Sequence, residues 1–575
     1  MSAIVLAVLG LLGFITGYQV YSRFVAEKVY RLDPNFRTPA HEFEDGVDFV
    51  PTNRFVLWGH HFTSVAGAAP IVGPAIAVIW GWLPAFLWVV LGTVFFAGVH
   101  DAGALWASSR NRAKSIGALT EDVIGKRARS IFMIVIFLLL LMVNAVFAIV
   151  ISNLFVSTPS SVFPSWIVMP IAAAIGILVY RRGVNLLWPT LIGITLLYAA
   201  MWAGEFIPLS LPAQVAGLSA PVVWVLILFL YAAIASVLPV WLLLQPRDYI
   251  NGMQLVVALG VIYAAILLGN PTVVAPAWNG TAATDLGAPP LIPLLFVTIA
   301  CGAISGFHGL VASGTTSKQI NKETDVRFVG YLGAVGEGTL ALAAIIVCTA
   351  GFATRGEWQA YYSSFTADGM TAYITGGARI VNDALGLPVA FSTTLLATMA
   401  VLFAATTMDT GVRLQRYIVQ EWGEIYNIKA LKGRYTATAI AVGSCFVLAF
   451  GAGGGAGTGG MIIWPLFGTT NQLLASLTLL VISVILMRLG RNVLVTLIPL
   501  SFVLVMATWA LVIQLIGFWN QGNYFLMGMD LLILGATILV GLEAIGALQK
   551  ARKDRDSGGG PGSGEAERVT METVG

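Results

Sequence analysis

The sequence is poor in charged residues. Only 10% of its 575 residues are Asp, Glu, Lys or Arg, whereas 58% are hydrophobic. Because a soluble domain has about 25% charged residues, this chain is too apolar to present a surface that water can solvate. Long polar segments are also missing, since the longest, 23–56 and 409–434, have the size of loops. We therefore expect no soluble domain.

Motifs for nucleotide-driven or metal-dependent chemistry are absent as well. There is no P-loop and no HExxH motif, which argues against ATP-driven transport by this chain and against zinc proteolysis. Gly455, Gly457 and Gly460 match a dinucleotide fingerprint only as a string of letters, because no expected strand precedes them. The three cysteines form no CxxC pair, so no disulfide framework is expected. No basic groove with interleaved aromatics is present, and we expect neither a nucleic-acid partner nor a cofactor beyond a coupling ion.

What the sequence does contain is long apolar runs. Runs of about 18 residues or more can cross a ~30 Å hydrocarbon core as helices, and lipid offers the backbone no hydrogen bonds, which favours helices over barrel strands. The first run, from Ala3 to Gln19, lacks a small-residue cleavage site, so we interpret it as a spanning helix rather than a signal peptide. The expected fold is an all-α polytopic membrane protein with about fifteen spans: 3–22, 57–80, 83–108, 129–154, 164–181, 185–207, 221–243, 253–270, 290–312, 328–353, 387–408, 435–451, 461–487, 493–517 and 525–548. The segment 359–386 is amphipathic and predicts a short interfacial helix.

The basic residues support this count and give an orientation. With the N-terminus outside and the spans alternating, 29 of the 31 Lys and Arg residues fall in segments on the cytoplasmic side, and only Arg355 and Arg379 do not. An error in the count would disrupt this alternation, so the positive-inside bias supports fifteen spans. We therefore predict a multi-pass protein of the cell inner membrane, embedded in the lipid bilayer. Its N-terminus is expected outside and its C-terminus in the cytoplasm.

We divide the chain into four parts. Residues 1–56 form an N-terminal helix and a cytoplasmic loop, 57–408 a transporter core, 409–548 the C-terminal spans and 549–575 a cytoplasmic tail. The end of this tail is rich in Gly, Ser and Glu and is expected to be disordered, because it cannot bury apolar area.

Span two is expected to be broken. It reads Trp58-Gly-His-His-Phe-Thr-Ser-Val-Ala-Gly-Ala-Ala-Pro-Ile-Val-Gly-Pro74, with small residues and two prolines at its centre. Proline interrupts a helix, and freed carbonyls are tolerated in lipid only where they face protein or a watery cavity. Such half-helix ends bind ions and carboxylates in secondary transporters, although a kink made only for close packing is the alternative. The residues expected to bind substrate here are Thr63, Ser64, Gly67, Ala68 and Pro70.

Span seven shows a second interruption, with Ser236 beside Pro239 inside the apolar run. It lies five spans after span two and runs in the opposite sense. Corresponding interruptions in inverted halves are a sequence indication of a midplane site. We therefore include Ser236 and Pro239 among the substrate-binding residues.

Span nine is also expected to be unwound, and it carries an imidazole, several glycines and several hydroxyls toward the cytoplasm. Ser and Thr oxygens with freed carbonyls suit a hard cation such as Na⁺, while His308 is able to take a proton near neutral pH. This predicts cation or proton coupling at His308, Ser313, Thr315 and Thr316. The alternative is that the hydroxyls bond back to their own helix.

Histidines and acids within the spans supply further candidates. His60, His61 and His100 lie on the same side as His308, and they predict either a proton relay or a metal site, with the structural role of a hydrogen-bonded histidine as the alternative. Charge within a bilayer is expensive, so Asp101 and Glu337 are expected to face the interior, and Glu337, without a local partner, is the better candidate for protonation. Asp409 is expected to pair with Arg413 one turn later.

The motifs described above, with several others, resemble those of the carbon starvation protein A (CstA) family, and the resemblance covers roughly residues 1–490. The motifs that carry the resemblance are these: Asp45-Gly-Val-Asp-Phe-Val-Pro-Thr-Asn53, Trp58-Gly-His-His-Phe62, Gly67-Ala-Ala-Pro-Ile-Val-Gly-Pro74, Ser108-Ser-Arg110, Val237-Leu-Pro-Val-Trp-Leu-Leu-Leu-Gln-Pro-Arg-Asp-Tyr249, Ser305-Gly-Phe-His308, Ser313-Gly-Thr-Thr316, Thr407-Met-Asp-Thr410, Arg416-Tyr-Ile-Val-Gln-Glu421 and Trp464-Pro-Leu-Phe-Gly-Thr-Thr-Asn-Gln472.

The resemblance implies cation-driven transport of pyruvate or small peptides. It further implies a five-plus-five inverted repeat like that of the amino acid–polyamine–cation transporters, with spans two to eleven as the core and spans two and seven as the broken pair. On this basis we expect alternating access around a midplane cavity, with Asn471 and Gln472 as donors to a substrate carboxylate. Three other functions stay open from the sequence: an intramembrane metal-dependent enzyme that uses the histidines, a membrane sensor, and a channel.

Overall fold

The computed structural model describes residues 1–556 except 47, 186, 240–241, 366 and 453–458. Apart from one hairpin with strands of two residues each, the regular structure in this part of the chain is helical. The expected all-α fold is confirmed.

The helices follow one another along the chain with short connections. The α-helices are α1 (Ala3–Thr16), α2 (Ser22–Phe24), α3 (Pro39–Glu42), α4 (Arg54–Val65), α5 (Ala69–Ala77), α6 (Trp82–Gly92), α7 (Gly98–Arg110), α8 (Ile116–Val123), α9 (Lys126–Ser157), α10 (Val162–Gly176), α11 (Leu187–Phe206), α12 (Ala220–Val237), α13 (Leu244–Gly269), α14 (Ala282–Asp285), α15 (Leu291–Thr298), α16 (Gly306–Gly314), α17 (Leu332–Ala350), α18 (Arg355–Tyr361), α19 (Gly369–Leu385), α20 (Val389–Ile425), α21 (Lys429–Lys432), α22 (Arg434–Gly451), α23 (Gly459–Arg488), α24 (Leu494–Asn520) and α25 (Tyr524–Asp556).

Short 3₁₀ and π-helical turns, and one hairpin, join or extend these helices. The turns are η1 (Gly17–Tyr21), η2 (Val25–Tyr30), η3 (Val78–Trp80), η4 (Thr93–Ala97), η5 (Pro159–Ser161), η6 (Ile177–Arg181), η7 (Thr316–Lys318) and η8 (Arg327–Tyr331). The hairpin pairs β1 (Gln214–Val215) antiparallel with β2 (Leu218–Ser219). Its two central residues, Ala216 and Gly217, both have positive φ, as a tight hairpin turn requires.

Fourteen of the fifteen predicted spans correspond to membrane-length helical segments. In the described part of the chain, 13 helices are long and apolar enough to cross a membrane, and α4 with α5 forms one further, bent candidate. The predicted span 290–312 holds α15 and α16 instead, which have only 8 and 9 residues. A helix of that length reaches about 12–14 Å, so neither crosses a bilayer alone. The total of fifteen spans remains a prediction.

Two segments that we expected to be cytoplasmic loops are helical. α20 runs through the predicted boundary at 408/409 and continues to Ile425, and α13 begins at Leu244. Several of the polar residues that suggested loops, such as Arg247 and Asp409, are buried within the protein. The charged residues at these positions form contacts inside the protein and do not indicate a solvent-exposed loop.

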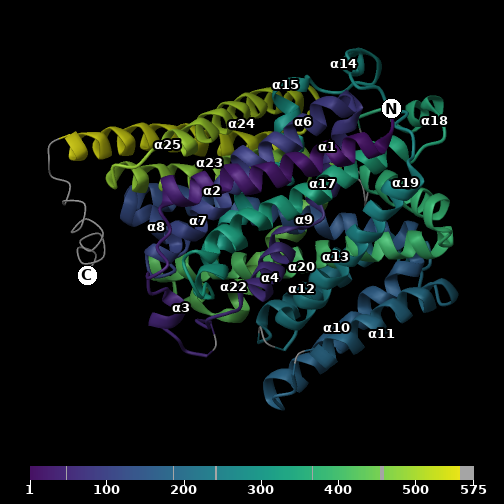
Figure 1. The fold of residues 1–575 in the computed structure, drawn as a ribbon, viewed down its shortest axis with the longest axis horizontal. Coiled ribbons are helices and arrows are strands. Elements are labelled where there is room, and N and C mark those ends of the chain that lie inside the picture. Colours follow the sequence, from purple (N-terminus) through teal and green to yellow (C-terminus); the bar gives the residue numbers. More distant parts are fainter. Residues whose placement is uncertain (47, 186, 240–241, 366, 453–458, 557–575) are drawn as a thin grey trace.

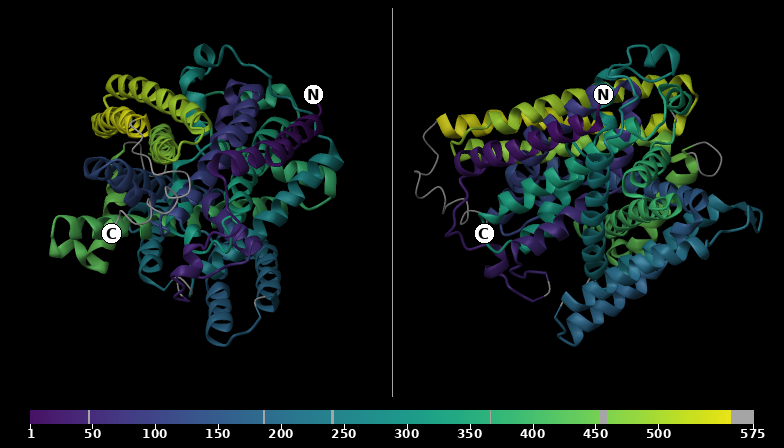
Figure 2. Two further views of the ribbon diagram at one scale, coloured as in Figure 1. Left: turned by 60° about the vertical axis from the view of Figure 1, so that its left-hand side comes forward. Right: turned by 45° about the vertical axis from the view of Figure 1, so that its right-hand side comes forward.

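The most buried helices form the centre of the bundle. In their most apolar 18-residue windows, α17 is 83% buried and α23 is 89% buried, against 28% for α25. Around them, α24 and α25 lie along one edge, and α10 with α11 forms a hairpin along the opposite edge (Figures 1 and 2). The amphipathic helix expected within 359–386 is present as α19, which packs against α5, α13, α17 and α20.

Close backbone contacts hold α15 and α16 against their neighbours. A β-carbon on Gly306, the first residue of α16, would lie 2.5 Å from the backbone nitrogen of Ala475 and from the carbonyl oxygen of Asn471. On Gly73 of α5, it would lie 2.5 Å from the carbonyl oxygen of Thr298. These atoms belong to backbone and cannot rotate away, so glycine is required for the helices to approach this closely.

Replacing Gly306 with alanine therefore should destabilise the protein. We expect Gly306→Ala to cost about 1–3 kcal/mol, the usual range for overpacking a tight core, and to lower the melting temperature of the detergent-solubilised protein. Gly260 on α13 is a matched control because a β-carbon there meets open space. An equal melting temperature for Gly306→Ala and Gly260→Ala would contradict the close approach of α16 and α23.

Candidate functional site

The bend between α4 and α5 is the first part of the candidate site. Asn53 caps α4 by accepting a hydrogen bond from the backbone N–H of Phe55 (2.9 Å). The helix ends at Val65, and Ala66 adopts non-helical backbone with φ −77° and ψ 86°. Pro70 is the second residue of α5, a position where a helix tolerates the missing N–H. The predicted break in span two is confirmed, and the two halves meet at an angle of 53°.

The predicted substrate residues around this bend are all buried, Gly67, Ala68 and Pro70 included. Thr63 and Ser64 donate their hydroxyl hydrogens to carbonyl oxygens one turn earlier in α4, both at 2.8 Å. Gly67 lies against α20, where a β-carbon on it would come 2.8 Å from the hydroxyl oxygen of Thr407. That hydroxyl is buried and has no hydrogen-bond partner among the described residues. The unwound turn thus lies next to an unpaired polar group.

A second break separates α15 from α16, over residues 299–305. Side chains from neighbouring helices satisfy the backbone there. Four of them donate hydrogen bonds to carbonyl oxygens of the break or of the last turn of α15: Trp464 to Thr298 (3.4 Å), Trp88 to Ile299 (3.2 Å), Thr93 to Gly302 (3.0 Å), and Gln472 to both Phe296 (3.1 Å) and Ile304 (3.4 Å). Because lipid cannot pair with backbone groups, these bonds are what allows an interruption at this depth.

Asn471 and Gln472 therefore do something other than what we predicted. We expected both amides to face a substrate carboxylate. Instead, Asn471 accepts the backbone N–H of Phe307 at the start of α16 (3.0 Å), and its amide group donates to Ser305 Oγ (3.1 Å). Gln472 donates to the carbonyls of the break. In this structure both residues position the break rather than present free donors.

The second break also corrects the prediction for span seven. α12 is continuous from Ala220 to Val237, so Ser236 and Pro239 lie at its end and not in its middle. Leu238, the residue before the proline, has extended backbone (φ −74°, ψ 154°), which is the conformation that a following proline favours. Pro239 thus ends α12 at the turn into α13. Of the three spans expected to be unwound, spans two and nine are broken, whereas span seven is continuous up to Val237.

A buried charge network joins α16 to α7 and α17. Asp101 on α7 accepts contacts from two imidazoles, His100 Nδ1 and His308 Nδ1, both at 2.7 Å. The other ring nitrogen of His308, Nε2, lies 3.2 Å from Glu337 Oε2 on α17. All four side chains are completely buried. The three residues that the sequence suggested separately for proton coupling, Asp101, His308 and Glu337, therefore form one contiguous triad with His308 in its centre.

The predicted cation ligands of span nine already have partners. Ser313 donates to the carbonyl of Gly309 (2.6 Å) and Thr315 to that of Val311 (3.0 Å), so both hydroxyls bond back to their own helix. Thr316 Oγ1 lies 2.9 Å from Nδ1 of His61. The bonds of Ser313 and Thr315 are the structural alternative that the sequence left open, and Thr316 contacts an imidazole instead.

The three histidines proposed for a metal do not meet. His61 contacts Thr316, His100 contacts Asp101, and His60 lines a cavity on the other side of α4. Within the described ranges no group of three His, Cys, Asp or Glu side chains is arranged to hold a metal ion. The interpretation of His60, His61 and His100 as a shared metal site is therefore wrong for this structure.

Two cavities lie on opposite sides of the breaks. The first, of about 710 Å³, is lined by Val72 of α5 and Leu294 of α15, together with residues of α9, α23 and α24. The second, of about 460 Å³, is lined by Ser64 of α4 and Ser313 of α16, and by residues of α9, α13 and α20. Each broken segment thus contributes one half to each cavity. α5 contacts α15, and α4 contacts α16, so the two broken segments run antiparallel.

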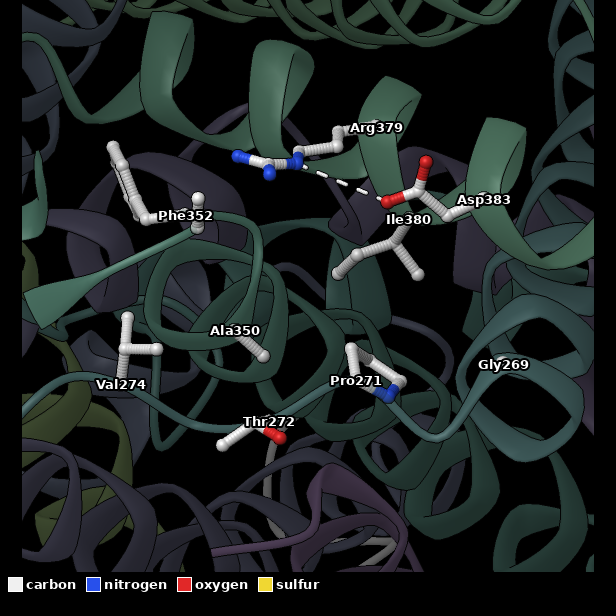
Figure 3. Close-up of a pocket in the computed structure, with 10 residues that line it drawn as sticks. Gly269, Pro271, Thr272, Val274, Ala350, Phe352, Arg379, Ile380 and Asp383 are labelled. Carbon is white, nitrogen blue, oxygen red and sulfur yellow. Dashed lines mark ion pairs between the residues drawn. The ribbon is translucent and has the colours of Figure 1, made fainter.

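A third, smaller pocket of about 190 Å³ lies away from the breaks, between the start of the loop after α13 and α19. Figure 3 shows Arg379 and Asp383 of α19 on one side of this pocket and Pro271 and Thr272 on the other. Arg379 Nε is 3.8 Å from Asp383 Oδ2, and both side chains are largely exposed. Charged groups exposed to this degree are screened by water, and the pocket is not part of the candidate site.

Sequence reasoning missed a second buried charge network near the start of α13. Arg247 forms an ion pair with Asp409 of α20 and also donates to the hydroxyl of Tyr231 on α12. Asp248 lies beside them, with its Oδ1 3.5 Å from an Arg247 nitrogen. The expected pair of Asp409 with Arg413 is wrong, because Arg413 donates instead to two carbonyls at the end of α12. Because we expected Arg247 to lie in a loop, the sequence did not indicate that Asp409 and Tyr231 are its partners.

Loops on the α4 side of the bundle are held by an ion pair. Glu323 is buried and receives hydrogen bonds from two nitrogens of Arg110, and the backbone N–H of Asp33 donates to it at 2.6 Å. Burial raises the pKa of Glu323, while the Arg110 guanidinium acts in the opposite direction. This contact fastens the loop after η2 to the segment after α16.

Comparison with known proteins identifies the family. A sequence model described as "Carbon starvation protein CstA" matches residues 2–365 and 354–510. The chain belongs to this family. Its relatives include the "Peptide transporter CstA" of Campylobacter jejuni, 35% identical over 91% of this chain and 81% of that one, and that of Bacillus subtilis, 30% identical over 94% and 96%. The "Pyruvate/proton symporter BtsT" of Escherichia coli is 32% identical over 89% of this chain and 82% of that one. The protein is therefore a member of a family of membrane transporters.

Solved structures resemble the chain only distantly. A manganese transporter mutant of Eremococcus coleocola aligns with a TM-score of 0.44 at 13% identity, covering 88% of this chain and 98% of that one. MhsT in complex with L-phenylalanine aligns with a TM-score of 0.42 at 13% identity, covering 86% and 99%.

The network around Arg247 leads to a stability prediction. Removing one partner of a buried ion pair leaves an uncompensated charge and typically costs about 3–5 kcal/mol, so Arg247→Met should lower the melting temperature of the purified protein strongly. The double variant Arg247→Met/Asp409→Leu removes both charges and should recover most of the loss. Arg23→Met, at an exposed ion pair, should have no measurable effect. A double variant no more stable than Arg247→Met would refute the pairing.

Proposed function

We propose that this member of the CstA family is a proton-coupled secondary transporter of a small organic solute that bears a carboxylate, such as pyruvate or a small peptide, and that it works by alternating access. The observation that carries the proposal is the sharing of two cavities by two broken helices. α5 and α15 line one cavity, and α4 and α16 line the other. A solute that passes from one cavity to the other must pass the unwound residues between the half-helices, where backbone groups are able to bind it.

The arrangement also supports an inverted repeat, in a corrected register. We assign α4–α5, α6–α7, α9, α12 and α13 to the first unit, and α15–α16, α17, α20, α22 and α23 to the second. Each unit then begins with a broken segment, and the two segments run antiparallel. The α10–α11 hairpin at the edge becomes an insertion (Figure 1). In this register the core extends to α23, beyond the end predicted at residue 408.

The Asp101–His308–Glu337 triad is the proposed site of proton coupling. With both acids ionised and His308 protonated, the triad has a net charge of −1, and one further proton makes it neutral. Because net charge is costly away from water, the exchange of this one proton switches the triad between a charged and a neutral state. His308 belongs to α16, one half of a broken segment. Proton loss would therefore change the electrostatic attachment of α16 to α7 and α17 and bias its position.

The names of the relatives support both parts of this proposal. The Escherichia coli relative is named as a pyruvate/proton symporter and several others as peptide transporters. We propose transport rather than catalysis as the activity of this chain. From the positive-inside bias, we place it in the cell inner membrane with the N-terminus outside and the C-terminus in the cytoplasm.

Proteoliposome uptake with separately imposed gradients tests the function. Liposomes containing the purified protein should accumulate radiolabelled pyruvate or alanyl-alanine when the interior is alkaline relative to the exterior. A proton ionophore should abolish the accumulation, and an inward Na⁺ gradient at equal pH should not support it. Accumulation driven by Na⁺ alone would contradict proton coupling, and no uptake of any carboxylate or peptide would contradict the transport proposal.

Variants of the triad test the coupling site. Glu337→Gln should abolish pH-driven accumulation while retaining exchange of internal for external substrate, because an amide cannot release a proton but fills the same space. His308→Ala should reduce uptake at unchanged expression. Glu424→Gln, at an exposed position near the end of α20, is the matched control and should behave like the wild type. Wild-type accumulation by Glu337→Gln and His308→Ala would remove the triad from the mechanism.

A further inference from the structure

The cavity lined by α4 and α16 contains two deeply placed groups of opposite charge. Asp248 of α13 and Arg413 of α20 both line it. Asp248 is 3% exposed and Arg413 is 9% exposed. No ion pair joins these two side chains among the described residues. The cavity therefore holds a carboxylate and a guanidinium apart.

Arg413 is fixed in place with donor capacity left over. One of its terminal nitrogens donates to the carbonyl oxygens of Ala235 and Leu238, both at 2.8 Å, which anchors the side chain to the end of α12. Its Nε is buried and has no hydrogen-bond partner among the described residues. A buried charged donor without an acceptor is costly, and a carboxylate is the acceptor that a guanidinium binds best.

Asp248 is likewise only partly satisfied. The neighbouring guanidinium of Arg247 is already engaged by Asp409 and Tyr231, and its contact to Asp248 is long, at 3.5 Å. Arg247 and Asp409 neutralise each other, so the charge of Asp248 remains available to the cavity. A carboxylate held beside a cavity in this way is suited to receive an ammonium group.

The other charged groups of the cavity are less suited to bind a ligand. Lys318 is half-buried and its nitrogen lies 5.5 Å from the centre of the Phe49 ring. Glu421 forms an ion pair with Arg129, and Asp48 is exposed. Water and existing partners screen these three groups, whereas Asp248 and Arg413 are both buried and neither is in contact with a partner that neutralises its charge fully.

We propose that Asp248 and Arg413 form a binding subsite for a zwitterion, with the ammonium group of the solute at Asp248 and its carboxylate at Arg413. This inference rests on the proposed transport function and specifies which solutes the site selects. Free amino acids and short peptides carry both charges. A simple monocarboxylate such as pyruvate carries only one and leaves Asp248 unpaired, so it binds more weakly.

Equilibrium binding of blocked and free peptides to the purified full-length protein tests the subsite. The probes are alanine, alanyl-alanine, N-acetyl-alanyl-alanine, alanyl-alanine amide and pyruvate. The wild type should bind the free dipeptide or amino acid about tenfold or more tightly than either blocked form or pyruvate, since each blocked form loses a charged hydrogen bond. The alanine and dipeptide arms distinguish a free amino acid from a peptide as the ligand.

Variants then assign each charge to its residue. Asp248→Asn should abolish the preference for the free over the N-acetylated dipeptide and leave the preference over the amide intact. Arg413→Lys, which keeps the charge and a donor for the α12 carbonyls, should weaken binding of the free carboxylate, whereas the amide should be little affected. Glu424→Gln should retain the wild-type pattern. Melting temperatures near that of the wild type establish that the variants are folded.

The outcomes separate this inference from the proposed function. Wild-type binding that does not distinguish free from blocked peptides, or an Asp248→Asn variant with the full wild-type preference, overturns the subsite even if uptake is proton-driven. Selective binding that Asp248→Asn abolishes, without any accumulation in proteoliposomes, supports the subsite and overturns the transport proposal. Failure of every probe to bind overturns the subsite.

Discussion

The hydrogen bonds that satisfy the backbone between α15 and α16 are the constraint on which the rest of the structure depends. A polypeptide that leaves helical conformation inside a bilayer loses its internal hydrogen bonds, and lipid offers none in return. In this protein Trp88 and Thr93 donate to carbonyls of the break, Trp464 donates to the last carbonyl of α15, and Asn471 and Gln472 bond to the helix ends on either side. Because these donors come from α6, η4 and α23, the break fixes how three other parts of the chain must pack around it. The glycines at positions 73 and 306 then allow the backbones to come close enough for those bonds to form.

The buried charges follow from the same constraint. An interior that contains unwound backbone and two cavities is polar enough to hold ionised groups, provided that they are paired. The Asp101–His308–Glu337 triad attaches α16 to α7 and α17, and the Arg247–Asp409 pair joins α13 to α20. The first network joins two acids to one imidazole, which is why we propose it as the site of proton exchange. The second is balanced, which leaves Asp248 and Arg413 available to the cavity beside it.

Much of this organisation could be predicted from the sequence, and the exceptions have physical reasons. Apolar runs located the membrane helices, and the small residues and prolines around Gly67 located the first break. The second break was placed at Pro239, because proline was taken as the sign of an interruption. The break at 299–305 lies in span nine, which was also expected to be unwound. It contains no proline and depends on hydrogen bonds from residues more than 150 positions away, so no local pattern gave its position. For the same reason the triad was predicted only as three separate candidates, and the pairing of Arg247 with Asp409, 162 residues apart, was missed.

The central claim is that the two broken helices separate two cavities that open to opposite sides in turn. Cysteine accessibility measures this directly, in a background in which Cys301, Cys348 and Cys445 have been replaced. A single cysteine is introduced by Val72→Cys for one cavity or Ser64→Cys for the other, and is labelled from each side of the membrane with an impermeant maleimide. The account predicts that substrate together with a proton gradient changes the two labelling rates in opposite directions. Rates that stay constant, or that rise and fall together, would contradict it.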